Sequence, residues 1–122
     1  MHLSMKFDTE GVDWAAAAAV YAAASLAPRD PARLAEDFAA ARAVCFTYDL
    51  ERLTGLARVV EGDSGPVIRD LAVLPAYVGM TLGHIMRDYL GRRVGAELKV
   101  ASADPAERHH HTQLELDEFL LP

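Results

Sequence analysis

The stretch LAVLPAYVGMTLGHIM, residues 71–86, decides the fold of this chain. Its first residues are nearly all apolar, as expected of a buried central strand, and Pro75 ends them. Helical spacing of apolar residues begins a few positions later, near Gly83. The backbone N–H groups at the start of such a helix, together with the helix dipole, can bind an anion, and glycines let the backbone approach it closely. These residues predict a buried strand, a short turn and a helix.

The rest of the chain alternates between helical and extended patterns. Asp13 and the Asp30-Pro31 pair are helix-start signals, because aspartate caps a first turn and proline suits its first position. Runs rich in β-branched and aromatic residues, separated by turn formers, indicate antiparallel strands. The predicted elements are a strand, two helices, three strands, a helix, a strand, a helix and a short last strand, at residues 5–10, 14–26, 31–38, 42–49, 52–62, 67–75, 80–94, 96–103, 105–116 and 118–122. This order indicates a mixed α/β layer structure.

Length and composition limit the class of protein. With 122 residues we expect a single domain, residues 1–122, around one core. The net charge of −6 argues against a nucleic-acid-binding protein, and the single cysteine, Cys45, excludes an internal disulfide. The apolar run 15–24 is too short to cross a bilayer, and the first residues lack the basic start of a secretory signal. We expect a cytoplasmic protein that binds neither nucleic acid nor membrane.

Three segments and the order of the elements resemble one family. The segments PRDPARLAEDFAAARAVCFTYDLERLTGLARVV (28–60), IRDLAVLPAY (68–77) and ASADP (101–105) resemble the GNAT superfamily of N-acetyltransferases. The resemblance implies an α/β GNAT fold, a mixed central β-sheet flanked by helices. Family members commonly follow the last helix with a β-hairpin, whereas only DEFLLP (117–122) stands here, so the resemblance implies a form shortened at the C-terminus. Because proteins normally cover a sheet edge, we expect a second copy to cover it in a homodimer.

The resemblance also implies a site for acetyl-CoA or a related acyl-CoA. The implied cofactor-binding residues lie at the end of the strand and in the six-residue loop motif after it: Leu71, Ala72, Val73, Val78, Gly79, Met80, Thr81, Leu82 and Gly83. Gly83 fits the motif, but Val78 replaces its polar first residue and Thr81 its central glycine. Met80 stands where many members carry Lys or Arg. Losing a charge-assisted contact costs about 1.5–3 kcal/mol, so we expect a weakened site for the phosphates.

Acyl transfer needs a base, a donor for the developing oxyanion and an acid for the leaving thiolate. The resemblance implies that a backbone N–H around residues 71–73 is the oxyanion donor. Asp70 is the candidate base, and the alternative is a carboxylate paired with a neighbouring arginine. In the family, a tyrosine of the last helix usually protonates the leaving thiolate. The resemblance places His111 at that position, so His111 is the candidate acid. The alternative is a solvated histidine on a helix surface.

The run His109–His111 could suggest a metal site. Successive residues of a helix point about 100° apart, so these three side chains cannot all bind one ion. No pair of Cys and His residues has the spacing of a zinc site either. The sequence therefore predicts no metal.

The predicted function is that of an acetyl-CoA-dependent N-acyltransferase acting on a small amine. One alternative stays open: a GNAT-like protein that has lost acetyl-CoA binding and serves as a binding or regulatory module, or catalyses a different reaction in the same cleft. The altered residues 78–81 and the missing tyrosine favour this alternative, whereas the family resemblance favours the transferase. Binding of acetyl-CoA distinguishes the two.

Overall fold

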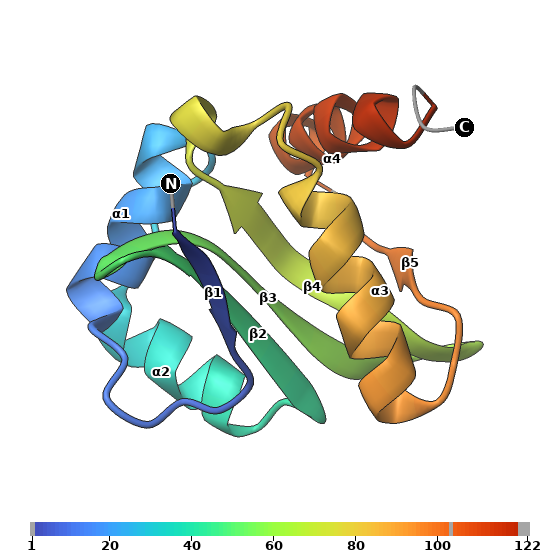
Figure 1. Ribbon diagram of the computed structural model, residues 1–122. Coiled ribbons are helices and arrows are strands. Elements are labelled where there is room, and N and C mark those ends of the chain that lie inside the picture. Colours follow the sequence, from blue (N-terminus) through green and yellow to red (C-terminus); the bar gives the residue numbers. More distant parts are fainter. Residues whose placement is uncertain (1, 103, 120–122) are drawn as a thin grey trace.

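The computed structural model describes residues 2–102 and 104–119 (Figure 1). The elements follow in the predicted order from the first strand to the last helix. They are β1 (Leu3–Lys6), α1 (Trp14–Ala23), α2 (Pro31–Ala39), β2 (Ala43–Asp49), β3 (Arg52–Gly62), β4 (Gly65–Val73), the 3₁₀ turn η1 (Pro75–Tyr77), α3 (Leu82–Val94), β5 (Lys99–Val100) and α4 (Pro105–Phe119). The predicted mixed α/β fold is therefore confirmed.

The strands form one sheet in the order β1-β2-β3-β4-β5. The first three pairings are antiparallel, and β5 runs parallel to β4. β5 is shorter than the predicted strand 96–103, because Gly95 and Ala96 close the C-terminal end of α3 by donating to the Gly91 carbonyl. The register between β4 and β5 consists of Val67–Lys99 and Ile68–Val100. β4 continues to Val73 beyond this register, so the two strands separate toward the end of β4 (Figure 1).

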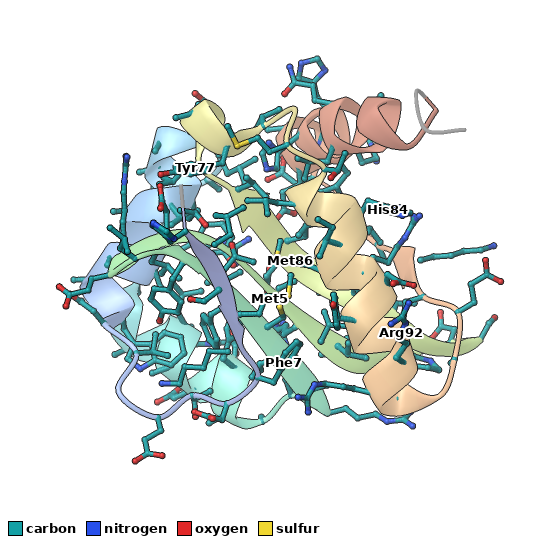
Figure 2. All side chains as sticks on the ribbon, viewed as in Figure 1. Met5, Phe7, Tyr77, His84, Met86 and Arg92 are labelled. Atoms are coloured by element: carbon teal, nitrogen blue, oxygen red, sulfur yellow. The ribbon has the colours of Figure 1, made fainter. Side chains whose placement is uncertain are left out.

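Helices cover both faces of the sheet. α1 and α2 lie on one face and α3 lies on the other, with α4 across the end of β4 (Figure 1). On the α1–α2 face, the rings of Trp14, Phe38 and Phe46 lie 5.5–5.9 Å apart. On the α3 face, the fully buried Met86 lies over the sheet (Figure 2), and its methyl group would be 3.4 Å from a Cβ on Gly55. One continuous core thus forms on both sides of the central strands.

The predicted starts of the first two helices are confirmed. The Asp13 carboxylate accepts hydrogen bonds from the backbone N–H groups of Ala15 and Ala16 at 3.0 and 3.1 Å. The Asp30 carboxylate accepts from the Arg33 N–H, and Pro31 occupies the first turn of α2. Each aspartate satisfies backbone donors that have no partner within the helix, which fixes where the helix begins.

A β-bulge interrupts β4 at Asp70. The register with β3 changes between Leu56–Ala72 and Arg58–Arg69, so β4 contains one residue more than β3 over this interval. Asp70 has a φ of 57°, in the left-handed region that side chains with a Cβ rarely adopt. The sequence analysis did not predict this bulge, which bends the strand shortly before it reaches the candidate site.

The end of the chain differs from the prediction. α4 extends to Phe119, so the short strand predicted over 118–122 is wrong at residues 118 and 119, while residues 120–122 lie outside the described part. The glutamates and leucines that precede this segment continue the helix rather than ending it. None of the helices in residues 2–102 and 104–119 combines the length and the apolar character needed to span a membrane.

Candidate functional site

Val73 lies at the end of β4, where β5 no longer accompanies the strand. Its backbone N–H donates to Nε2 of His110 on α4 at 3.2 Å. The next amide, that of Leu74, donates to the Thr54 carbonyl on β3 at 2.8 Å. Successive amides of a strand point in opposite directions, so the Val73 N–H is directed away from β3 and toward α4. The segment 71–73 was predicted to supply the oxyanion donor. In this segment, the backbone N–H of Val73 points out of the sheet toward α4.

A groove of about 460 Å³ opens beside this amide. Its lining comes from the end of α1, the end of β4 with the following turn, and α4: Ala23, Ala24, Ser25, Val73, Pro75, Val78, His109, His110 and Gln113. Sites for small molecules usually measure about 300–1,000 Å³, so the groove has the size for one. Most of its lining is small or apolar, and its titratable side chains are the two histidines.

His110 is buried, with 5% of its surface exposed. Burial, with smaller contributions from His111 and His109, lowers its pKa to about 4. The ring is therefore neutral at pH 7, and because Nε2 accepts the Val73 N–H, the proton resides on Nδ1. The sequence analysis singled out His111 and missed His110, since the pattern of the helix does not show which histidine faces the end of β4.

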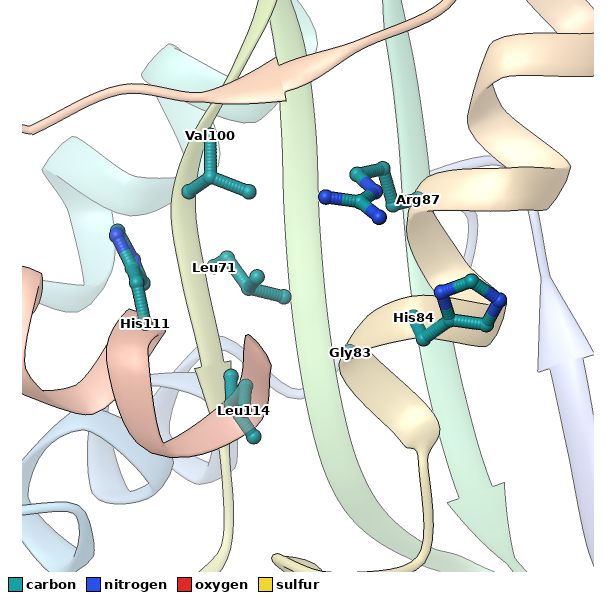
Figure 3. Close-up of a pocket in the computed structure, with 7 residues that line it drawn as sticks. All are labelled: Leu71, Gly83, His84, Arg87, Val100, His111 and Leu114. Atoms are coloured by element: carbon teal, nitrogen blue, oxygen red, sulfur yellow. The ribbon is translucent and has the colours of Figure 1, made fainter. Parts of the chain in front are cut away.

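The space between β4, β5, α3 and α4 is narrow. Figure 3 shows the residues that line it: Leu71, Gly83, His84, Arg87, Val100, His111 and Leu114. Its volume of about 10 Å³ has room for roughly one water molecule. A Cβ added to Gly83 would lie 3.2 Å from Leu114, so the two helices pack closely at this glycine. The predicted cofactor-binding residues Leu71 and Gly83 are thus brought together, with α4 covering them.

His111 lines the narrow space between β4, β5, α3 and α4, and the residue is only 6% exposed. The alternative of a solvated histidine on the helix surface is therefore wrong, because α4 packs this side of the helix against the sheet. His110 and His111 are neighbours in sequence, yet one faces the groove beside Val73 and the other faces the space beside Leu71. Their ring centroids lie 6.3 Å apart.

Of the other predicted cofactor-binding residues, Ala72 is buried in β4, Leu82 is buried at the start of α3, and residues 78–81 form the loop before α3. Gly79 has a φ of 94° and is exposed, and Thr81 has a φ of 59°. Thr81 makes no side-chain cap to α3, because its hydroxyl donates to the Met80 carbonyl at 2.7 Å. Met80 is 39% exposed and Val78 is half-buried. The helix start is thus not capped by the side chain that precedes it, in contrast to α1 and α2.

Asp70 forms ion pairs with two arginines. One carboxylate oxygen accepts from Arg29 at 2.9 Å and the other from Arg58 at 2.6 Å. Burial raises the pKa of this carboxyl group, but the hydrogen bonds and charges of Arg58 and Arg29 outweigh it, so the pKa is lowered. The paired carboxylate that the sequence left as an alternative is what the structure shows. Both oxygens of Asp70 are engaged, which makes it poorly suited to accept a proton.

These ion pairs extend to α4. Arg29 also contacts the carboxylate of Glu107 at 2.7 Å, and its guanidinium lies 4.5 Å from the ring centroid of Tyr21. Glu107 in turn accepts a hydrogen bond from the Ser102 hydroxyl. Arg29 belongs to the loop between α1 and α2, so this cluster joins that loop, the bulge of β4 and the first turn of α4. It determines which side of α4 faces the end of β4.

Solved structures share the fold of this chain. The chain matches a probable acetyltransferase from meticillin-resistant Staphylococcus aureus with a TM-score of 0.66 and 21% identity, over 98% of this chain and 91% of the other. It matches a GNAT-family acetyltransferase from Streptococcus pneumoniae with a TM-score of 0.63 and 19% identity, over 99% and 94%. The chain has the GNAT fold. A third GNAT-fold match is AAC(6′)-Iy in complex with the bisubstrate analogue CoA-S-monomethyl-acetylneamine, at a TM-score of 0.62 and 15% identity, over 93% and 90%.

No family model matches the chain, and no curated protein matches it in sequence. The likeness thus lies in the fold at low sequence identity. The order and pairing of the elements are shared, whereas the chemistry of the site must be argued from this chain's own residues.

Proposed function

We propose that this protein is an N-acetyltransferase that transfers the acetyl group of acetyl-CoA to a small amine. The observation that carries the proposal is the Val73 N–H, which points out of the sheet at the end of a bulged strand, beside a groove of ligand size. The GNAT fold and the matched AAC(6′)-Iy complex, whose ligand joins CoA to an aminoglycoside fragment, support both the donor and the kind of acceptor.

In this proposal, backbone N–H groups bind two parts of acetyl-CoA: the start of α3 binds the phosphates, and the end of β4 binds the thioester carbonyl. The uncapped start of α3, with Gly79 at positive φ and no atom within 4 Å of a Cβ placed there, leaves room for phosphates to approach backbone N–H groups. When bound, acetyl-CoA supplies a thioester with an electrophilic carbonyl carbon. The Val73 N–H then donates to the carbonyl oxygen and stabilises the negative charge that develops as the amine attacks.

His111 supplies the proton for the leaving thiolate in this proposal. It lines the space beside Leu71 and Gly83, where the thioester sulfur would follow the carbonyl along β4. As the C–N bond forms and the C–S bond breaks, His111 gives a ring N–H proton to the sulfur. The net charge of −6 favours the approach of a cationic amine such as a polyamine or an aminoglycoside.

Binding requires α4 to move. The space between α3 and α4 has room for about one water molecule, and Leu114 packs on Gly83. We therefore propose that α4 separates from α3 when acetyl-CoA enters. A conformational step of this kind reduces the apparent affinity by the fraction of molecules that are open.

The homodimer expected from the sequence is part of the proposal. β5 is an edge strand of two residues, and on the side away from β3 the end of β4 has no strand beside it in the described residues. An unpaired edge is commonly covered by another chain. Light scattering at micromolar concentration should give twice the mass of one chain, and a monomer would contradict the dimer without affecting the proposed activity.

Thermal unfolding with acetyl-CoA tests the function. A ligand at a hundredfold excess over its dissociation constant stabilises the folded state by about 2.7 kcal/mol, which raises the melting temperature by several degrees in a chain of this size. Thiol release from acetyl-CoA in the presence of spermidine or kanamycin then measures transfer. An unchanged melting temperature at millimolar acetyl-CoA would overturn the proposed function.

A further inference from the structure

The Val73 N–H can serve one acceptor at a time. In the structure that acceptor is His110 Nε2, 3.2 Å from the amide nitrogen. A thioester carbonyl oxygen that takes this hydrogen must come within about 2.7–3.2 Å of the same nitrogen, and so must occupy the place of Nε2. Binding of the acyl group therefore displaces His110 but leaves its ring next to the carbonyl.

We propose that His110 is the general base of the acetyl-transfer step, and that its hydrogen bond to Val73 is its resting state before the thioester binds. The inference rests on the proposed function. It assigns to His110 a role that Asp70 cannot perform while both of its carboxylate oxygens contact arginines.

The groove provides the approach for the amine. His110 lines it together with residues of α1 and of the β4 end, so a displaced ring stays between the Val73 amide and the groove. With the proton on Nδ1, Nε2 carries the lone pair that a base requires. A neutral amine in the groove attacks the carbonyl carbon and forms the C–N bond. Its extra proton passes to Nε2, while the C–S bond breaks and the thiolate takes a proton from His111.

The surroundings of His110 explain how it changes from acceptor to base. On its own helix the titratable neighbours are His109 and His111, and burial is the main cause of its low pKa. From α1 and from the β4 end, the groove is lined by uncharged residues: Ala23, Ala24, Ser25, Val73, Pro75 and Val78. When α4 separates and water reaches the ring, the pKa moves toward its ordinary value near 6.5. The ring thus gains basicity at the step in which it is needed.

Two variants and one control separate catalysis from binding. His110→Ala removes the base and also the competitor for Val73, so acetyl-CoA should bind at least as tightly while kcat falls about a hundredfold or more. His110→Gln can still accept the Val73 N–H but cannot take up a proton, so it should bind like the unmodified protein and lose kcat similarly. Thr112→Ala, on an exposed part of α4, should change neither quantity.

Nitrogen NMR of the histidine rings gives a readout that needs no amine acceptor. Without ligand, His110 should titrate near pH 4, and with saturating acetyl-CoA its pKa should rise by one unit or more while the Val73 amide signal shifts. If acetyl-CoA binds and neither signal changes, or if His110→Ala keeps kcat within threefold, the role of His110 is overturned and the proposed function stands. If the unmodified protein binds no acetyl-CoA, the proposed function itself fails.

Discussion

Asp70 and Thr81 adopt nearly the same unusual backbone conformation in very different surroundings. Their φ angles are 57° and 59°, a region that costs a residue with a Cβ about 1–2 kcal/mol. Asp70 lies in the middle of the sheet and is fixed by ion pairs to Arg29 and Arg58. Thr81 lies in a loop, and its hydroxyl donates a hydrogen bond to the carbonyl of the adjacent Met80.

The difference indicates what each strained residue does. The ion pairs offset the strain at Asp70 and give the strand its bulge, which directs the Val73 amide toward α4. At Thr81 the strain has little compensation, and the residue stands where the family's motif has glycine. Asp70 is thus a structural element of the site, whereas Thr81 is a position at which this chain departs from a better-suited residue.

The largest expected effect comes from Asp70→Asn. The variant leaves Arg58 largely buried without its counter-charge and Arg29 with Glu107 as its remaining carboxylate, so the free energy of unfolding should fall by about 3 kcal/mol. Urea unfolding measures the loss. Asp37→Asn is the matched control, because its ion pair with Arg33 lies on the surface and should contribute less than about 1 kcal/mol. Equal losses in both variants would show that the ion pairs of Asp70 contribute no more than a surface pair does.

The pH dependence of stability sharpens the same comparison. The pKa of Asp70 is lowered from its ordinary value of 3.8 in the folded state. A lowered carboxyl pKa contributes stability that is fully present above the unfolded-state pKa and is lost as the pH falls through the folded-state pKa. The difference between the unmodified protein and Asp70→Asn should therefore be constant above about pH 5 and shrink below about pH 4. A difference that grows in acid would contradict this.

Changing the loop toward the family motif should affect binding next most strongly. The combined variant Val78→Gln, Met80→Arg and Thr81→Gly adds a charge-assisted contact and removes a branched side chain at the start of α3. One such contact is worth about 1.5–3 kcal/mol, so acetyl-CoA affinity should increase tenfold or more. Isothermal calorimetry measures it. Unchanged affinity would mean that α4, not the loop, limits binding.

The smallest expected effect is that of Thr81→Gly on stability. Relief of the positive φ gains about 1–2 kcal/mol, and the extra freedom of glycine in the unfolded chain costs about 0.5–1 kcal/mol, so a net gain of about 0.5 kcal/mol is expected. Thr112→Gly, inside α4, should instead lose about 0.5 kcal/mol, since it has no strain to relieve. Thermal unfolding measures whether each variant gains or loses stability. A loss of stability at both positions would show that Thr81 is not strained.

The elements were predictable because their signals are local. Asp13 and Asp30 cap helices through hydrogen bonds to residues two or three positions away, and the pattern of apolar residues shows the strands. The extra residue at Asp70 was not predictable, because a bulge depends on the partner strand. The short length of β5 was missed as well, since Ala96, the first residue of the predicted strand, serves instead to end α3.

The candidate site was only partly predictable. The end of β4 and the loop after it were located by the resemblance, whereas the choice between His110 and His111 was not. These residues point about 100° apart on α4, so the rotation of the helix about its axis decides which of them faces Val73. The rotation is determined by the contacts of Glu107 with Arg29 and of Leu114 with Gly83, which join residues far apart in the chain.

By itself, the sequence determined the order of strands and helices and the starts of α1 and α2. These depend on neighbouring residues, whose interactions persist in any fold that the chain adopts. Only the tertiary structure decided that Asp70 forms ion pairs with two arginines and that His110 accepts the hydrogen bond of the Val73 N–H. Both facts require α4, β4 and the loop between α1 and α2 to meet, and that meeting is a property of the packed core.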